Sequence, residues 1–166
     1  GATAVPYNYI TVYISPFYYA YENLPTYERM AWLMNHEIVH VIAMDQAAPR
    51  DQLFRNLFFG KVVPESENPI SLLYGYLTNP RRYAPRWYHE GIACFMETWT
   101  NQGNGRILNP YYEMEFRSLV YGQDHIYDAV GLESEGTAID FQVGSMSYLY
   151  GTRFFGYLAI STVPKN

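Results

Sequence analysis

The chain has 166 residues and a formal net charge of −5, with 16 Asp and Glu against 11 Lys and Arg. This length suffices for one domain with a buried core, and the single Cys excludes both an internal disulfide framework and a Cys-rich zinc module. The chain has neither the clustered basic charge of a nucleic-acid-binding protein nor the apolar run of about 20 residues that a transmembrane helix needs. We therefore expect no nucleic-acid partner and no transmembrane segment.

The predicted elements begin with a strand over residues 7–15, where apolar and polar side chains alternate. A helix is predicted over 25–44, because apolar residues recur at helical spacing after a Pro that suits a first helical turn. The same spacing predicts a helix over 86–98 and a last helix over 141–160. Shorter helices, separated by polar loops rich in Pro, Gly and Asn, are expected over 49–59, 70–77 and 110–121.

The residues that carry chemistry begin with the run His36-Glu37-Ile38-Val39-His40 in the first predicted helix. Residues four apart on a helix lie on the same face, one turn apart. Two imidazoles placed in this way can bind one zinc ion, and the Glu beside the first can reach the attacking water as a general base. Catalytic zinc usually has three protein ligands and one open position. The run therefore predicts His36 and His40 as ligands of Zn²⁺ and Glu37 as the catalytic base, with a third ligand elsewhere.

A second motif, together with the first, resembles the gluzincin metallopeptidases. In those families another helix carries the pattern W-x-x-E-G-x-A-x-x-x-E, and here the matching residues are Trp87, Glu90, Gly91, Ala93 and Glu97. The resemblance implies that Glu90 is the third zinc ligand and that Glu97 accepts a hydrogen bond from a ligand His. The wide gap between the motifs is more similar to the bacterial peptidase-MA-like domains than to thermolysin or the M1 aminopeptidases. The alternatives are a Glu90 that pairs only with Arg86 and a Glu97 that lies in solvent.

Two further residues in the second motif, Gly91 and Cys94, also allow structural predictions. Gly inside a helix costs about 1 kcal/mol relative to Ala, so Gly91 indicates a close approach, which we expect to be to the helix that carries His36. Cys94 is expected to be a small buried residue and not a metal ligand.

The last predicted helix carries Tyr148-Leu149-Tyr150-Gly151, which resembles the Y-x-K-G segment of the M1 peptidases. The resemblance implies that Tyr148 is a catalytic residue whose hydroxyl donates a hydrogen bond to the oxyanion of the tetrahedral intermediate. Tyr150 is the competing candidate, and the two lie about 200° apart around a helix, so both cannot face the metal. The alternative for Tyr148 is a plain core Tyr.

These resemblances imply an α+β fold, zincin-like and mostly helical, in which the strand over 7–15 belongs to a small mixed sheet that is incomplete in this chain. We expect a single zincin-like metallopeptidase domain over 1–166, taken from a longer protein with additional domains. The expected activity is zinc-dependent hydrolysis of peptide bonds, as an endopeptidase acting on a peptide or protein substrate. The resemblance favours an extracytoplasmic location, in the bacterial periplasm or cell envelope.

Two other functions stay open. One is a non-catalytic, zincin-like binding module of a larger envelope protein, against which the presence of Glu37 argues. The other is a zinc hydrolase that acts on a bond other than a peptide bond.

Overall fold

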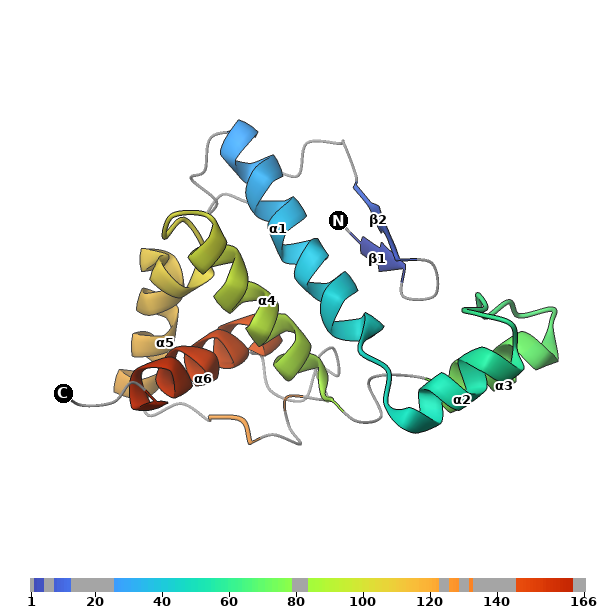
Figure 1. Ribbon diagram of the computed structural model, residues 1–166. Helices are drawn as coiled ribbons and strands as arrows, with labels where there is room; N and C mark the ends of the chain where they lie inside the picture. The colour runs from blue at the N-terminus through green and yellow to red at the C-terminus, as the bar shows by residue number, and fades with distance from the viewer. Residues whose placement is uncertain are drawn as a thin grey trace.

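The computed structural model describes residues 2–4, 8–12, 26–78, 84–122, 126–128, 132 and 146–162, and this part of the chain is mostly helical (Figure 1). The strands are β1 (Ala2–Ala4) and β2 (Tyr9–Thr11). The helices are α1 (Thr26–Asp45), α2 (Pro49–Leu57), α3 (Pro69–Thr78), α4 (Arg86–Thr100), the short 3₁₀ helix η2 (Arg106–Leu108), α5 (Pro110–Gly122) and α6 (Met146–Thr162).

The mostly helical fold predicted from apolar spacing is confirmed for the described residues. The two helices that carry the motifs, α1 and α4, begin at Thr26 and Arg86, close to the predicted starts. The predicted opening of the last helix, 141–145, and the predicted continuation of the strand over 13–15 lie outside the described residues. No helix in the described ranges is long and apolar enough to cross a bilayer.

Of the described residues in the strand predicted over 7–15, only Tyr9–Thr11 form a strand, β2, while Asn8 lies in a turn and Val12 lies outside the strand. Strand β2 pairs antiparallel with β1, with Ala2 opposite Thr11 and Ala4 opposite Tyr9. Both strands contact α1, and Figure 1 shows them beside that helix. Within the described ranges the sheet consists of these two strands, so they do not form the mixed sheet that the resemblance implies. The connection between them is too short for a parallel crossover, which needs a dozen or more residues, and so only antiparallel pairing is open to them.

Helix α4 lies between α1 and α6 and contacts both (Figure 1). Its contact with α6 is close because two glycines face each other. A Cβ on Gly91 would lie 2.6 Å from the Cα of Gly151, and a Cβ on Gly151 would lie 2.2 Å from the backbone oxygen of Trp87. The close approach predicted at Gly91 therefore exists, but the predicted partner is wrong, because Gly91 meets α6 and not α1. Neighbouring residues on a helix point about 100° apart, so Glu90 can face α1 while Gly91 faces α6.

This helix contact gives a first prediction. Gly151→Ala should lower the free energy of unfolding by about 3 kcal/mol, because the new methyl group meets backbone atoms that cannot move aside as a side chain can. The matched control is Gly156→Ala on the same helix, where an added Cβ meets nothing within 4 Å. That variant should stabilise the chain by up to about 1 kcal/mol through helix propensity. Urea denaturation of both variants checks the prediction, and similar effects of the two would contradict it.

The core that backs α6 is largely aromatic. Leu149 is fully buried and packs with Leu132. Partly buried side chains from α4, α5, α6 and residues 126–128 surround this pair, and they include Trp87, Tyr112, Phe116, Leu119, Tyr127 and Tyr150. These contacts hold α6 against α4. They therefore fix which residues of α6 lie beside the two motifs on α1 and α4.

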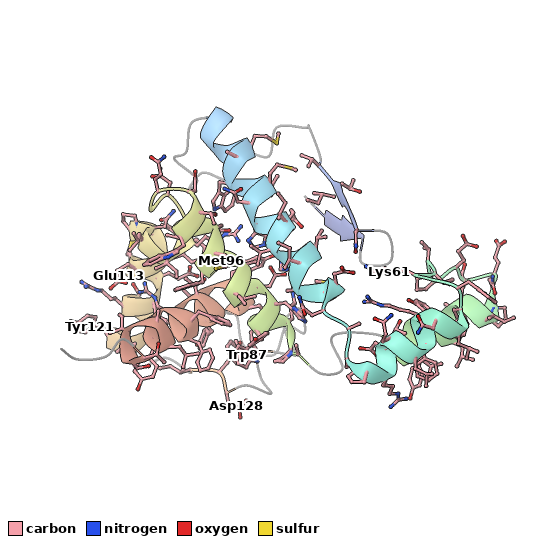
Figure 2. The ribbon with its side chains drawn as sticks, in the orientation of Figure 1. Lys61, Trp87, Met96, Glu113, Tyr121 and Asp128 are labelled. Carbon is pink, nitrogen blue, oxygen red and sulfur yellow. The ribbon has the colours of Figure 1, made fainter. Side chains whose placement is uncertain are left out.

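An ion-pair network marks the C-terminal end of α1. Asp45 accepts hydrogen bonds from Lys61 and, at 3.5 Å, from Arg55, and Lys61 also donates to Asn8 at 2.6 Å. The side chain of Lys61 extends from the connection between α2 and α3 toward this end of α1 (Figure 2). The hydrogen bonds from Lys61 and Asn8 lower the pKa of Asp45. The network therefore joins α1, just beyond its motif, to the α2–α3 connection and to the turn before β2.

Candidate metal centre

His36 and His40 lie one turn apart on α1, and both are buried. Their ring planes are nearly perpendicular, at 86°, and their Nε2 atoms are 3.0 Å apart. Two buried nitrogens at this separation converge on one point, which is the arrangement that the spacing of the motif requires of a metal-binding pair.

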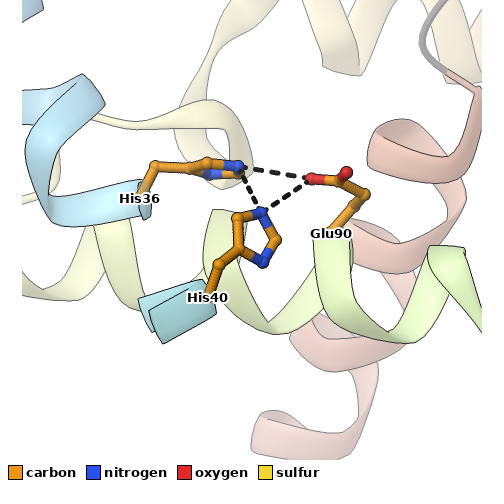
Figure 3. A group of neighbouring side chains, drawn as sticks. All are labelled: His36, His40 and Glu90. Atoms are coloured by element: carbon orange, nitrogen blue, oxygen red, sulfur yellow. Dashed lines mark hydrogen bonds and ion pairs between the residues drawn. The ribbon is translucent and has the colours of Figure 1, made fainter. Parts of the chain in front are cut away.

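Glu90 brings a third donor atom from α4 to the same point. Its Oε2 lies 3.3 Å from His36 Nε2 and 3.1 Å from His40 Nε2. Figure 3 shows the two imidazoles from α1 and the carboxylate from α4 pointing toward one another. The three residues predicted as metal ligands therefore form one triangle of donor atoms, with sides of 3.0 to 3.3 Å.

Protons alone do not account for this triangle. An imidazole nitrogen either donates or accepts a hydrogen bond but cannot do both, so protons fully satisfy at most two of the three contacts. A cation can accept a lone pair from all three atoms. Ligand atoms of a tetrahedral zinc with bonds of about 2.0–2.2 Å lie about 3.3–3.6 Å apart. The triangle would need to widen by only a few tenths of an ångström, and its nitrogen and carboxylate donors are ones that zinc accepts.

The charge around the triangle also favours a cation. Burial opposes ionisation of Glu90, but hydrogen bonds from His36 and His40 outweigh it and hold the pKa of this carboxyl well below its ordinary value. Burial alone would lower the pKa of His36, but its contacts with Cys94, Glu90 and Glu97 raise it well above the ordinary value. The other oxygen of Glu90 lies 3.7 Å from Arg86 Nε. The pairing with Arg86 that sequence left as an alternative is thus present, but it does not draw the carboxylate away from the two imidazoles.

Glu97 is fully buried, and its Oε2 lies 2.7 Å from His36 Nδ1. The alternative of a Glu97 in solvent is therefore wrong. When the imidazole is neutral, a carboxylate here accepts a hydrogen bond from Nδ1–H of His36, which leaves the Nε2 lone pair directed at the other two atoms of the triangle. This is the placement expected of a group that orients a ligand imidazole, and its effect on metal binding stays a prediction.

Arg106 is a member of the centre that sequence did not single out, because it stands at the end of a Gly- and Asn-rich loop. Its backbone N–H donates to Glu97 Oε1 at 3.1 Å, and its guanidinium lies 3.5 Å from Glu97 Oε2. The carbon of the guanidinium also lies over the rings of Trp32 and Tyr148, at 4.4 and 4.6 Å. Burial opposes the charge of Arg106, but the neighbouring Cys94 and Glu97 raise its pKa well above the ordinary value. Arg106 therefore carries a permanent positive charge at the back of the site.

Local packing explains how Arg106 reaches this position. A Cβ on Gly105 would lie 2.1 Å from Thr98 Oγ1, so only Gly allows the chain to pass this close to α4. Thr98 Oγ1 then accepts the backbone N–H of Ile107 at 3.3 Å. The loop after α4 thereby folds back along the helix and brings Arg106 beside Glu97.

Cys94 is fully buried, as expected. With His36 and Glu97 it forms a second group of possible ligand atoms. Arg106 Nη1 lies 3.1 Å from Cys94 Sγ and 3.3 Å from His36 Nδ1. A guanidinium in this group opposes a metal ion by charge, so the triangle on the Nε2 side of His36 is the better site for one.

Glu37, the predicted base, is also buried, at 6% exposure, and lies on α1 beside His36. Carboxylates are seldom buried without a charged or polar partner. Glu37 is therefore not an ordinary surface carboxylate.

The two tyrosines of α6 have different surroundings. The ring of Tyr148 stacks against that of His36, with centroids 5.9 Å apart, whereas Tyr150 packs against Phe116 and accepts a hydrogen bond from the backbone N–H of Tyr127 at 3.3 Å. Burial, and then the negative charge of Glu90, raise the pKa of Tyr148, so its hydroxyl keeps its proton. Tyr148 is thus the tyrosine of this pair that lies beside the candidate metal ligand His36, while Tyr150 belongs to the core.

Comparisons with models of protein families, with curated proteins and with solved structures gave no match to this chain. The case for a function accordingly depends on the residues and their geometry.

Proposed function

We propose that this chain is a zinc metallopeptidase domain of the gluzincin type, with a zincin-like fold. The observation that carries the proposal is the triangle of His36 Nε2, His40 Nε2 and Glu90 Oε2, which comes from two separate motifs and fits a metal ion better than it fits protons. These three residues would hold the ion. Zinc, when bound, supplies a Lewis acid that polarises a carbonyl oxygen and lowers the pKa of a coordinated water.

The remaining site residues have distinct roles in the proposed hydrolysis. Glu37 takes a proton from the water whose oxygen attacks the carbonyl carbon, and it passes the proton to the leaving amine when the C–N bond breaks. The hydroxyl of Tyr148 donates a hydrogen bond to the oxyanion of the tetrahedral intermediate. Glu97 keeps the Nδ1 proton on His36, so that Nε2 presents its lone pair. The half-exposed Arg86 stays paired with Glu90 and limits the movement of that carboxylate.

We further propose a peptide or protein substrate cleaved internally, and an extracytoplasmic location such as the bacterial periplasm or cell envelope. Both follow from the resemblance of the two motifs to gluzincins and to peptidase-MA-like domains. The same resemblance supports the idea that the chain belongs to a longer protein with further domains.

The test is a digest of a mixed peptide library by the chain loaded with one equivalent of zinc. We expect cleavage that stops when a chelator removes the zinc and returns when zinc is restored, and mass spectrometry of the products gives the cleavage preference. Zinc binding without cleavage of peptides, proteins or ester substrates would instead support the non-catalytic binding module. Cleavage that persists in the chelator would contradict the proposed function.

Tyr148 gives the next prediction. Tyr148→Phe should lower kcat by about a hundredfold, because one hydrogen bond to the developing oxyanion is lost. Zinc content should not change, since Tyr148 is not a ligand. The matched control is Tyr150→Phe, which removes only the hydroxyl that Tyr127 contacts and should leave kcat within about twofold. Steady-state kinetics on the best library substrate measures both variants, and equal kcat values in the two would contradict the role of Tyr148.

A further inference from the structure

Arg106 joins the three helices that carry the proposed site. Its guanidinium contacts Trp32 of α1, Glu97 of α4 and Tyr148 of α6. Its backbone N–H also binds Glu97. A side chain that merely filled space would not need a permanent charge at a position so poorly exposed to solvent, because burial of a charge is costly unless it is paired.

The proposed site combines the positive charge of Arg106 with three buried or nearly buried carboxylates. Glu37, Glu90 and Glu97 are all buried or nearly so, and Glu97 has no exposure at all. The guanidinium of Arg106, 3.5 Å from Glu97 Oε2, places a permanent positive charge beside this carboxylate whether or not an ion is bound.

Arg106 and a bound metal ion act on the same excess of negative charge. The ion would lie on the Nε2 edge of His36, and Arg106 lies against its Nδ1 edge. Each cation therefore lowers the electrostatic cost of the buried carboxylates, and each should matter most when the other is missing. Contributions of two groups that share partners in this way are not additive.

We infer that Arg106 stabilises the metal-free site by balancing the negative charge of its buried carboxylates, an inference that rests on the proposed function. It supplies the positive charge that pairs with Glu97, the carboxylate that contacts His36 Nδ1. Arg106 contacts His36 at Nδ1 and Glu97 at Oε2, and neither atom belongs to the triangle of proposed ligand atoms.

The test compares thermal unfolding of the wild-type chain and Arg106→Met, each with a chelator and with excess zinc. Met keeps much of the length of Arg but removes the charge. Loss of one partner of a buried ion pair should lower the Tm of the metal-free variant by about 10 °C. With zinc bound the loss should be half of that or less, so the rise in Tm that zinc produces should be larger in the variant than in the wild type.

Arg153→Met is the matched control. Arg153 also pairs with a carboxylate, Glu113, and lies over an aromatic ring, that of Phe116. These partners of Arg153 belong to α5 and not to the triangle. Its loss should lower the Tm equally with and without zinc. If Arg106→Met does not fold under either condition, Arg106→Gln, which retains a hydrogen-bonding side chain, is compared by the same criterion.

The outcomes separate the two proposals. A wild-type chain whose Tm does not respond to zinc would contradict the proposed function, and this inference with it. A zinc response in the wild type that is equal or smaller in the Arg106 variant would contradict the inference alone.

Discussion

Glu90→Ala is expected to lose tight zinc binding while the chain stays folded. The substitution removes one corner of the triangle and leaves His36 and His40, 3.0 Å apart, as the remaining donors. It also removes a carboxylate oxygen that lies within 3.3 Å of both imidazoles. Losing a group that only orients a ligand typically costs 10- to 100-fold in affinity, so losing the ligand itself should cost more than about 100-fold. A titration with zinc against a chromophoric chelator measures this change, and circular dichroism checks the fold.

Glu113→Ala is the control for Glu90→Ala. Glu113 is a carboxylate on α5 that pairs with Arg117 of the same helix and with Arg153 of α6. Its removal changes the net charge by the same amount but takes nothing from the triangle, so zinc affinity should stay within about twofold of wild type. If Glu90→Ala bound zinc as tightly as this control, the metal would be held elsewhere, and the group of Cys94 and Glu97 would be the first place to examine.

Glu37→Gln is expected to retain zinc and abolish most turnover. The amide has nearly the shape of the carboxylate, so the α1 helix and its two imidazoles should keep their places, but it cannot accept a proton from the attacking water. General base catalysis typically contributes about 10²- to 10⁴-fold, and kcat should fall by that factor. The measurement is kcat on the best library substrate, with zinc content determined on the same samples.

His40→Ala provides the comparison for Glu37→Gln, because it should lose zinc together with activity. The two variants thus separate a residue that does chemistry from a residue that holds the ion. Near-normal kcat in a zinc-loaded Glu37→Gln chain would show that another group accepts the proton, and the role assigned to Glu37 would be wrong.

The parts of the fold and site that sequence predicted are those set by short-range spacing. Helices α1 and α4 follow from apolar periodicity, and the meeting of His36 with His40 follows from their separation by one turn. The arrival of Glu90 at the same point could be expected only through the resemblance of its motif to a known pattern, because nothing in local spacing says which face of α4 meets α1.

The parts that sequence missed depend on contacts between distant segments. The prediction for Gly91 correctly gave a close approach but assigned it to the wrong helix. A glycine in a helix indicates that a neighbouring segment is close, but it does not identify that segment. Sequence does not single out Arg106, because its position depends on Gly105 packing on Thr98, a contact that no periodicity encodes. A buried cation beside a motif of carboxylates could have been sought from charge balance, but the sequence does not say which Arg reaches the site.

The most direct test of the central claim is the anomalous signal at the zinc absorption edge from crystals of the chain grown with one equivalent of zinc. We predict one peak per chain, about 2.0–2.2 Å from His36 Nε2, His40 Nε2 and Glu90 Oε2. A zinc peak bound by Cys94 and Glu97 on the other side of His36, or none near the triangle in a crystal with zinc bound elsewhere, would contradict it.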